Sequence, residues 1–232
     1  MKTSFWTKLF DLISPRLCCV CGSRLTVGEA AICSHCLLHL PRTYYWKSPL
    51  DNPMARLYWG LVPIEKAVAL FFYEPKSELS QLIYDLKYHN RPDIGTDMGR
   101  IAAKEFQLNG LFDDIDALVP VPLTRRRRWQ RGYNQSMEIA RGVSQATGLP
   151  IYNKVVARRH FTESQTHKGF WQRHDNVENA FELKDASLLK GKHLLVVDDI
   201  VTTGSTTMAC MEAISKAGDV KLSVMALGFS KS

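Results

Sequence analysis

A segment near the C-terminus constrains the fold more than any other part of this chain. The four apolar residues 194–197 form a buried strand, and two adjacent acids, Asp198 and Asp199, follow them directly. Five small residues, 202–206, then lead into a helix expected from about Ser205 to Lys216. A buried strand that passes through a short loop into a helix is the building unit of a parallel sheet covered by helices.

The same alternation of strands and helices runs through most of the chain. Apolar runs predict strands at 68–73, 117–121 and 221–227. Helical patterns follow the capping residue Ser77 and begin again at about Asn134. An arginine-rich loop is expected before the second of these helices, and a polar, irregular loop at 158–180. We therefore predict an α/β fold with a mostly parallel sheet flanked by helices.

The composition divides the chain into three parts. Residues 1–41 hold a short amphipathic helix and a cluster of cysteines, residues 42–63 contain three prolines and are predicted to be a linker, and residues 64–232 form the α/β domain. The 232 residues are 45% hydrophobic, so a sizeable core is available and wholesale disorder is excluded.

Charge and hydropathy limit the classes of function. The net charge of +7 favours a polyanionic partner, either nucleic acid or a phosphorylated small molecule, although a soluble protein can be basic without one. No uninterrupted apolar run is long enough to cross a bilayer. Lys8 and Asp11 break the apolar N-terminal stretch, which excludes a secretory signal, and we expect a cytoplasmic protein.

The acids and the small residues after the buried strand suit a phosphorylated sugar. Residues 202–206 can turn backbone N–H groups and hydroxyls onto a phosphate, and the following helix N-terminus adds a favourable dipole. Because like charges repel, Asp198 and Asp199 suit ribose hydroxyls or a bridging Mg²⁺ and not the phosphate. An ordinary strand–loop–helix junction would explain one Asp and one Thr, but not the whole run.

A dense cationic stretch follows the strand at 117–121. It holds five arginines within seven residues, namely Arg125, Arg126, Arg127, Arg128 and Arg131. Guanidinium groups match phosphate oxygens well, and Trp129 and Tyr133 can stack on bases as in single-strand-binding proteins. A solvated basic turn explains residues 125–128 equally well.

The cysteines near the N-terminus have metal-binding spacing. Cys18 and Cys21 form one Cys-x2-Cys pair, and Cys33 and Cys36 form a second. Four thiolates suit tetrahedral Zn²⁺, and such a closed site is structural and not catalytic. Two alternatives fit the spacing less well: Cys19 as a ligand in place of Cys18, and a set of buried reduced thiols.

The segment 194–206 resembles the 5-phosphoribosyl-1-pyrophosphate (PRPP) signature of type I phosphoribosyltransferases. Only about thirteen residues are involved, but their order and their chemistry both match. The resemblance implies that Asp198 and Asp199 are the catalytic acids and hold the ribose hydroxyls. It implies that the 5-phosphate is bound by Thr202, Thr203, Gly204, Ser205 and Thr206.

The chain as a whole resembles the ComF family of competence-related proteins. The matching features, in chain order, are the cysteine cluster, Leu86-Lys87-Tyr88, Val119-Pro120-Val121-Pro122, Arg131-Gly132-Tyr133-Asn134-Gln135, Gln165, Arg173, Asn176, Phe181 and the PRPP signature. The resemblance implies a zinc-finger-like segment joined to a type I phosphoribosyltransferase-like domain. It also implies that Arg131 and Gly132 contact pyrophosphate, and that a loop carrying Gln165 and Arg173 closes over the site.

Three functions follow from these readings. The resemblance favours a protein that binds PRPP with Mg²⁺ and single-stranded DNA in DNA uptake and natural transformation, with a competence helicase as a partner. The alternative is an active phosphoribosyltransferase, for which nothing in the sequence identifies the acceptor base. A scaffold that has lost its ligand is opposed by the complete acid pair and phosphate loop.

Overall fold

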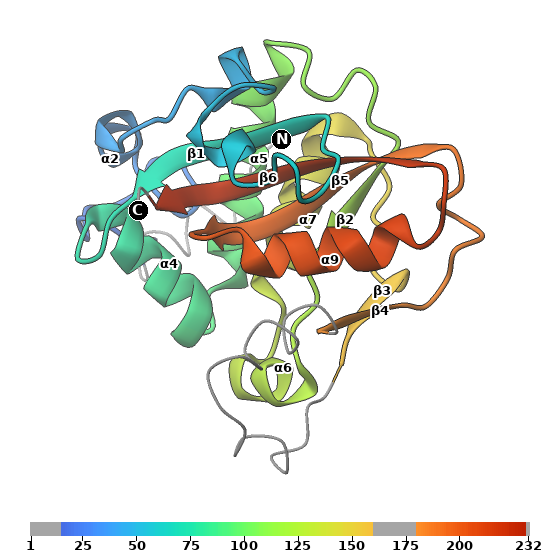
Figure 1. Ribbon diagram of the computed structural model, residues 1–232. Coiled ribbons are helices and arrows are strands. Elements are labelled where there is room, and N and C mark those ends of the chain that lie inside the picture. The colour runs from blue at the N-terminus through green and yellow to red at the C-terminus, as the bar shows by residue number, and fades with distance from the viewer. Residues whose placement is uncertain (1–14, 160–179, 231–232) are drawn as a thin grey trace.

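The structure is a computed structural model that describes residues 15–159 and 180–230. At its centre lies a four-stranded sheet in the order β1-β6-β5-β2, in which all neighbouring strands are parallel. The strands are β1 (Lys66–Tyr73), β2 (Ala117–Pro120), β5 (Lys192–Val201) and β6 (Val220–Ser230). The predicted parallel sheet is confirmed, and every predicted strand lies in it (Figure 1).

Helices cover both faces of this sheet (Figure 1). One face carries α4 (Glu78–Tyr88), α5 (Pro92–Gln107) and α7 (Gln135–Thr147). The other carries α9 (Ser205–Ser215) and a hairpin of β3 (Val156–Arg158) and β4 (Phe181–Leu183) that packs against it. None of the helices within 15–159 and 180–230 combines the length and the hydropathy that a membrane span requires.

Successive side chains of each central strand enter different cores, as the pleat of a strand requires. Along β5, Leu195 and Val197 join the core beneath α5 and α7, whereas Leu194 and Val196 join the core beneath α9. Because both faces are buried, this strand is continuously apolar. The burial ends at Asp198, the first partly exposed position at the carboxyl end of the strand.

The cysteine-containing segment, with its short helix α2 (Ser34–His39), packs on α5. The buried N–H of Ala31 donates to Asp97 Oδ2 at 2.9 Å, and the Arg42 guanidinium pairs with Glu105 at 2.9 Å. Both carboxylates belong to α5, so the segment shares its core with the α/β domain. The boundaries 1–41, 42–63 and 64–232 remain predictions.

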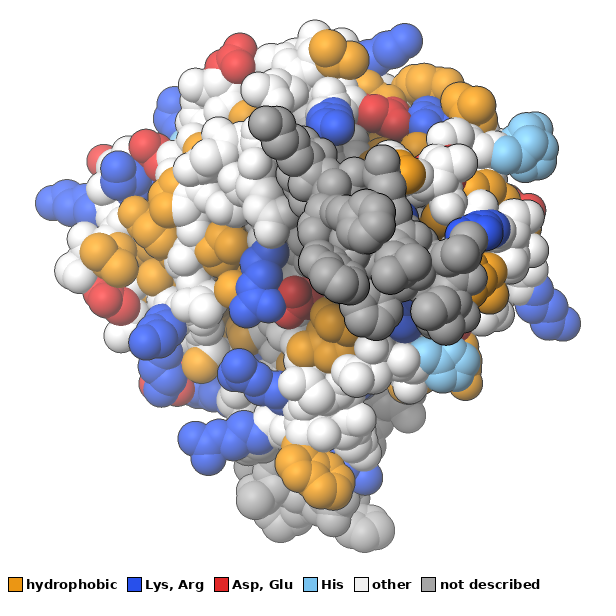
Figure 2. Space-filling model, turned by 180° about the vertical axis from the view of Figure 1, so that it is seen from behind, with side chains coloured by type: hydrophobic (Ala, Val, Ile, Leu, Met, Phe, Trp, Pro, Cys, Tyr) orange, Lys and Arg blue, Asp and Glu red, His pale blue; other side chains and the backbone are white. Residues whose placement is uncertain are grey.

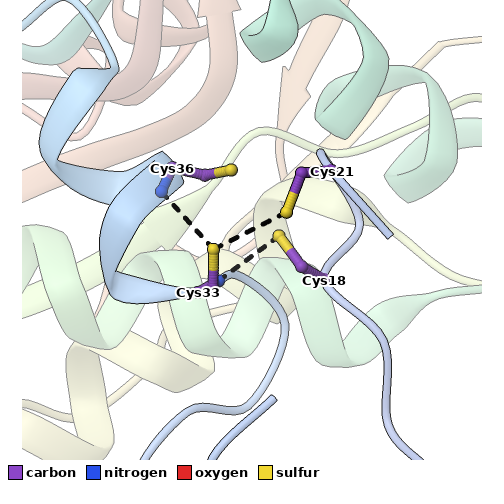
Figure 3. A group of neighbouring side chains, drawn as sticks. All are labelled: Cys18, Cys21, Cys33 and Cys36. Carbon is purple, nitrogen blue, oxygen red and sulfur yellow. Dashed lines mark hydrogen bonds between the residues drawn. The ribbon is translucent and has the colours of Figure 1, made fainter. Parts of the chain in front are cut away.

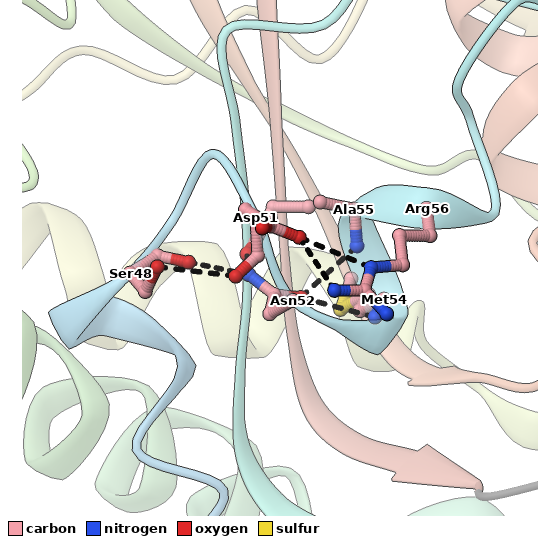
Figure 4. Close-up of polar contacts among 7 residues, drawn as sticks. Ser48, Asp51, Asn52, Met54, Ala55 and Arg56 are labelled. Carbon is pink, nitrogen blue, oxygen red and sulfur yellow. Dashed lines mark hydrogen bonds and ion pairs between the residues drawn. The ribbon is translucent and has the colours of Figure 1, made fainter.

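The stretch 42–63, predicted to be a linker, folds onto the sheet. It forms a 3-10 helix, η1 (Tyr45–Lys47), and the short helix α3 (Pro53–Arg56), and its Tyr58 is fully buried. Asn52 caps α3 through its Oδ1 (Figure 4). Its Nδ2 donates to the carbonyl of Ala67 in β1 at 2.9 Å, and this bond helps to fix the stretch to the sheet.

The arginine-rich stretch is a helix, α6 (Arg125–Arg131), and the expectation of a loop was wrong. Thr124 Oγ1 accepts a hydrogen bond from the N–H of Arg127 at the start of the helix, and Gly132 ends it with a φ of 76°. Arginine forms helices readily, and none of the α6 side chains is buried, so the charges remain in water. The two capping residues therefore outweigh the mutual repulsion of the arginines.

Candidate functional site

The two predicted acids lie at the carboxyl end of β5, where open parallel sheets bind ligands. Asp198 Oδ1 accepts a hydrogen bond from Ser136 Oγ at 3.0 Å and another from the N–H of Asp199 at 2.9 Å. Burial, together with the neighbouring charge of Asp199, raises the pKa of Asp198 to about 7. The carboxyl group is therefore poised to change its protonation near neutral pH.

Asp199 has a different partner. Its Oδ2 lies 3.1 Å from Nζ of Lys87, which belongs to the last turn of α4. The side chains of both residues are largely buried, at 21% exposure for Lys87 and 13% for Asp199. An ammonium group thus stands beside the acid pair, where two adjacent carboxylates would otherwise repel each other.

The predicted phosphate loop surrounds a small hollow directly beyond the acids. The hollow measures about 220 Å³, is open to solvent, and is lined by Asp198 and residues 200–207. Gly204 adopts a φ of +75°, and no side chain caps the N-terminus of α9 that follows it. The first N–H groups of α9 therefore remain available to an anion, as the sequence predicts for the 5-phosphate.

Tyr58 supports this loop from below. Its hydroxyl lies 2.7 Å from Thr207 Oγ1, and Thr207 in turn donates to the carbonyl of Gly204 at 2.8 Å. The Tyr58 ring lies in van der Waals reach of Gly204. The stretch predicted to be a linker thus holds the floor of the phosphate loop.

The aromatic and cationic residues singled out in the sequence are spread over several environments. Trp129 is 87% exposed on α6, whereas the half-buried Tyr133 donates its hydroxyl proton to the carbonyl of Leu86. Arg131 lies 5.3 Å from the centre of the Tyr88 ring and donates to Gln135 Oε1 at 2.9 Å. Trp129 is therefore available to a ligand, while Tyr133 has a structural contact.

Two of the predicted residues have no described position. Gln165 and Arg173, expected on a loop that closes over the site, lie outside the described residues.

Asn134, at the start of α7, donates through its Nδ2 to the carbonyl of Val121 at 2.9 Å. It thereby fixes α7 at the carboxyl end of β2 and places Ser136 beside Asp198.

The four cysteines of the two Cys-x2-Cys pairs converge, as predicted (Figure 3). All their sulfur atoms lie within 4.8 Å of one another, and Cys21 Sγ is 3.8 Å from Cys33 Sγ. A tetrahedron with Zn–S bonds of about 2.3 Å has sulfur atoms about 3.8 Å apart. Backbone N–H groups donate to Cys18 Sγ and Cys33 Sγ, as suits thiolates. The donor set can therefore hold a metal ion.

Cys19 lies outside this group. It is half-buried and packs against the hydrophobic core, and its sulfur atom is not one of the four that converge. Its backbone N–H donates to the carbonyl of Ala31 at 3.0 Å. Of the alternatives for the first knuckle, the geometry favours Cys18.

Sequence reasoning missed two residues of the site and left a third undecided. Ser136 directly follows the motif that was recognised, and Tyr58 fell in the supposed linker. Lys87 belongs to a motif that was recognised, but a contact with phosphate and a lysine extended along the helix surface explained it equally well. The hydroxyl of Ser136, two positions after the helix-capping Asn134, was the one local signal. Lys87 and Tyr58 approach the site only through tertiary packing.

The chain is similar to bacterial proteins over most of its length. It is 31% identical over 228 residues to the DNA utilization protein YhgH of Escherichia coli K12, which covers 93% of this chain and 98% of that protein. It is 30% identical over 153 residues to Competence protein F of Haemophilus influenzae, which covers 64% of this chain and 67% of that protein. A purine phosphoribosyltransferase structure from Pyrococcus horikoshii has 18% identity and a TM-score of 0.36, and covers 58% of this chain and 72% of that one. No family model matches the chain.

A parallel sheet flanked by helices, with an acid pair and a hydroxyl-rich loop at the carboxyl end of one strand, is the phosphoribosyltransferase-like arrangement that the sequence predicts. Among proteins with this arrangement, the extent of the similarity to YhgH and to Competence protein F identifies the lineage. The chain belongs to the ComF family, as its sequence motifs predict.

Proposed function

We propose that this protein binds PRPP with Mg²⁺ at the carboxyl end of β5 and also binds single-stranded DNA, acting in DNA uptake and natural transformation. The observation that carries the first half is the position of Asp198 and Asp199 beside the hollow formed by residues 200–207. Ribose hydroxyls donate to the two carboxylates, and the 5-phosphate accepts hydrogen bonds from the loop and from the start of α9. Arg131 and Gly132 contact the pyrophosphate group, and Mg²⁺ neutralises part of its negative charge.

Calorimetric titration with PRPP and Mg²⁺ tests this half. Asp198→Asn combined with Asp199→Asn removes both acceptor charges with little change in shape, and PRPP binding is expected to disappear. The exposed acid Asp219, at the opposite end of β5 and β6, supplies the control variant Asp219→Asn. Unchanged affinity in the double variant would leave only the scaffold interpretation.

The second half rests on charge and on an exposed aromatic side chain. The net charge is +7, and α6 presents Trp129 and its arginines to solvent. Stacking on one base contributes about 1–3 kcal/mol, so Trp129→Ala is expected to weaken binding of an oligothymidylate at least about fivefold. Trp59→Ala removes another half-exposed tryptophan, one that pairs with Arg56, and is the matched control. Equal loss in both variants would contradict the proposal.

Zinc in the cysteine site completes the proposed composition. Four thiolates in a closed arrangement give zinc a structural role, since no position remains for water or substrate. A competence helicase is the protein partner that the family relationship suggests. Copurification with that helicase tests this association. The full chain is compared with a variant that is altered in α6 but has the same net charge.

Transfer of the phosphoribosyl group is the second candidate function. It is favoured by the contact of Ser136 Oγ with Asp198, because a site that only retained a scaffold would have no need to orient this carboxylate. Catalysis would rest on positioning and on stabilising a cationic ribose in the transition state. Release of pyrophosphate from PRPP, measured with a panel of purines, pyrimidines and orotate, tests it. Absence of turnover with every acceptor would contradict it.

A further inference from the structure

A second concave surface lies between α6 and the β3–β4 hairpin. This groove is open to solvent, measures about 1050 Å³, and is therefore several times larger than the hollow at the phosphate loop. Its apolar lining includes Pro122, Leu123 and Val156. We call it the α6–hairpin groove.

The two walls of the α6–hairpin groove carry the same sign of charge. Arg125 and Arg128 come from α6, and the hairpin side supplies Arg158, Arg159 and Lys184. Within the described parts of the chain, five of the eleven lining residues are therefore cationic and one, Glu182, is acidic. Residues distant in sequence converge here, so the basic surface is not confined to the arginine run of α6.

The hairpin wall is ordered by contacts that leave its cations accessible. The Arg158 guanidinium lies over the Phe181 ring, 5.2 Å from its centre, in a cation–π contact between the two strands of the hairpin. Glu182 Oε2 lies 2.9 Å from Lys184 Nζ and 3.8 Å from Arg159 Nε. The side chains of Arg159 and Lys184 are still 50% and 49% exposed, and can therefore contact a ligand.

We infer that the α6–hairpin groove binds the sugar–phosphate backbone of single-stranded nucleic acid, with α6 and the hairpin contacting phosphates from opposite sides. This inference rests on the single-stranded DNA binding proposed above and gives it a location. Grooves that bind single strands combine a cationic path for the backbone with aromatic side chains for the bases. Trp129 lies one helical turn after Arg125, so the two side chains are neighbours on the surface of α6, and Trp129 is exposed.

A single strand fits this groove better than a small anion or a duplex. One phosphate or pyrophosphate would contact only part of a cationic surface that extends over two walls. A duplex is a rigid convex rod, whereas the cations here line the inside of a concavity. Figure 2 shows Lys and Arg side chains over much of the face seen from behind, with Asp and Glu side chains among them.

The hairpin wall provides the decisive test, because α6 is already implicated by its sequence. Arg159→Gln with Lys184→Gln removes two charges from exposed side chains and leaves Phe181 and Arg158 in place. The control, Lys47→Gln with Lys104→Gln, removes two exposed charges from η1 and α5. Both double variants are full-length chains with the same net charge.

Binding of a fluorescent oligothymidylate of about 16 nucleotides is measured by anisotropy as a function of salt. Loss of two phosphate contacts should reduce the slope of log affinity against log salt by about 1.4, at about 0.7 for each contact. The hairpin variant is also expected to bind roughly tenfold more weakly at 100 mM salt than the control variant. Glu182→Gln, which removes the one acid among the described residues that line the groove, is expected to bind more tightly than the wild type.

The outcomes separate this inference from the proposed function. If the wild type binds no oligothymidylate, the DNA half of the proposed function fails and the groove fails with it. If the wild type binds but the hairpin variant matches the control, the groove alone is overturned. Equal affinity for a duplex of the same sequence, or equal competition by polyglutamate, would overturn the assignment to a single strand. PRPP titration of the hairpin variant, expected to match the wild type, verifies that the site at β5 is intact.

Discussion

Lys87 on α4 and Asp199 on β5 form an ion pair of 3.1 Å at the mouth of the proposed ribose phosphate site. The ammonium group stands where a positive charge is needed most, beside two adjacent carboxylates. A divalent cation delivered with a phosphorylated ligand would meet the same need. Lys87 therefore acts as a counter-ion for the acid pair in the ligand-free protein.

Removing this counter-ion should make the protein depend on Mg²⁺. Lys87→Gln is expected to lower the free energy of unfolding by about 1 kcal/mol, because Asp198 and Asp199 then repel without compensation. Mg²⁺ should recover part of this loss in the variant and have a smaller effect on the wild type. Urea unfolding with and without Mg²⁺ measures both effects, with Lys104→Gln on the exposed side of α5 as the control. Equal stabilisation of all three proteins by Mg²⁺ would refute the counter-ion role.

Asp198 should make the protein less stable as the pH rises. Its pKa is about 7 in the folded protein, above the value of about 3.9 in an unfolded chain. The folded state therefore holds the extra proton between these values. The contribution of Asp198 to stability is therefore largest below about pH 4, falls as the pH rises toward 7, and stays reduced above it.

Asp198→Asn abolishes this dependence and keeps both acceptor contacts of Oδ1. After allowance for partial exposure, its stability advantage over the wild type should be about 1–2 kcal/mol larger at pH 8 than at pH 5. Denaturant unfolding at the two pH values measures the difference, and Asp219→Asn serves as an exposed control. A difference that does not change with pH would show that Asp198 titrates normally.

Metal content should distinguish the two cysteines of the first knuckle. Cys18 belongs to the convergent group of four sulfur atoms and Cys19 does not. We expect one zinc ion per chain in the wild type and in Cys19→Ser, and much less in Cys18→Ser. Loss of the ion should also lower the melting temperature of the whole chain, because Ala31 and Arg42 fix this segment to α5. Elemental analysis and thermal unfolding check both points, and the reverse pattern would assign the ligand to Cys19.

The parts of the site that could be predicted from the sequence are those made by consecutive residues. The strand at 194–197, the acids and the loop are one local pattern. Because both faces of the strand are buried, it is continuously apolar, and the pattern can be recognised in the sequence. Lys87, Ser136 and Tyr58 arrive from α4, α7 and the supposed linker, and only the packing of helices around the sheet brings them to β5. The α6–hairpin groove could not be predicted from the sequence for the same reason, because its walls lie on segments that are separate in the chain.

The backbone of the phosphate loop depends on Gly204, whose φ is +75°. An alanine in this conformation costs about 1–2 kcal/mol, while its Cβ would lie no closer than 3.4 Å to Tyr58 and Met208. The strain therefore comes from the backbone and not from a clash, and the loop can relieve it by turning its amides away from the hollow. Gly204→Ala is then expected to weaken PRPP binding about tenfold, since the ligand must restore the strained conformation.

A second glycine separates this effect from a general loss of stability. Gly148 ends α7 with a φ of +79°, and nothing lies within 4 Å of a Cβ placed there. Gly148→Ala should therefore lose similar stability in urea unfolding and yet bind PRPP like the wild type. Equal affinity of the two variants for PRPP would mean that the loop amides do not hold the phosphate. A loss confined to Gly204→Ala would tie the affinity to the direction of the amides that this one residue sets.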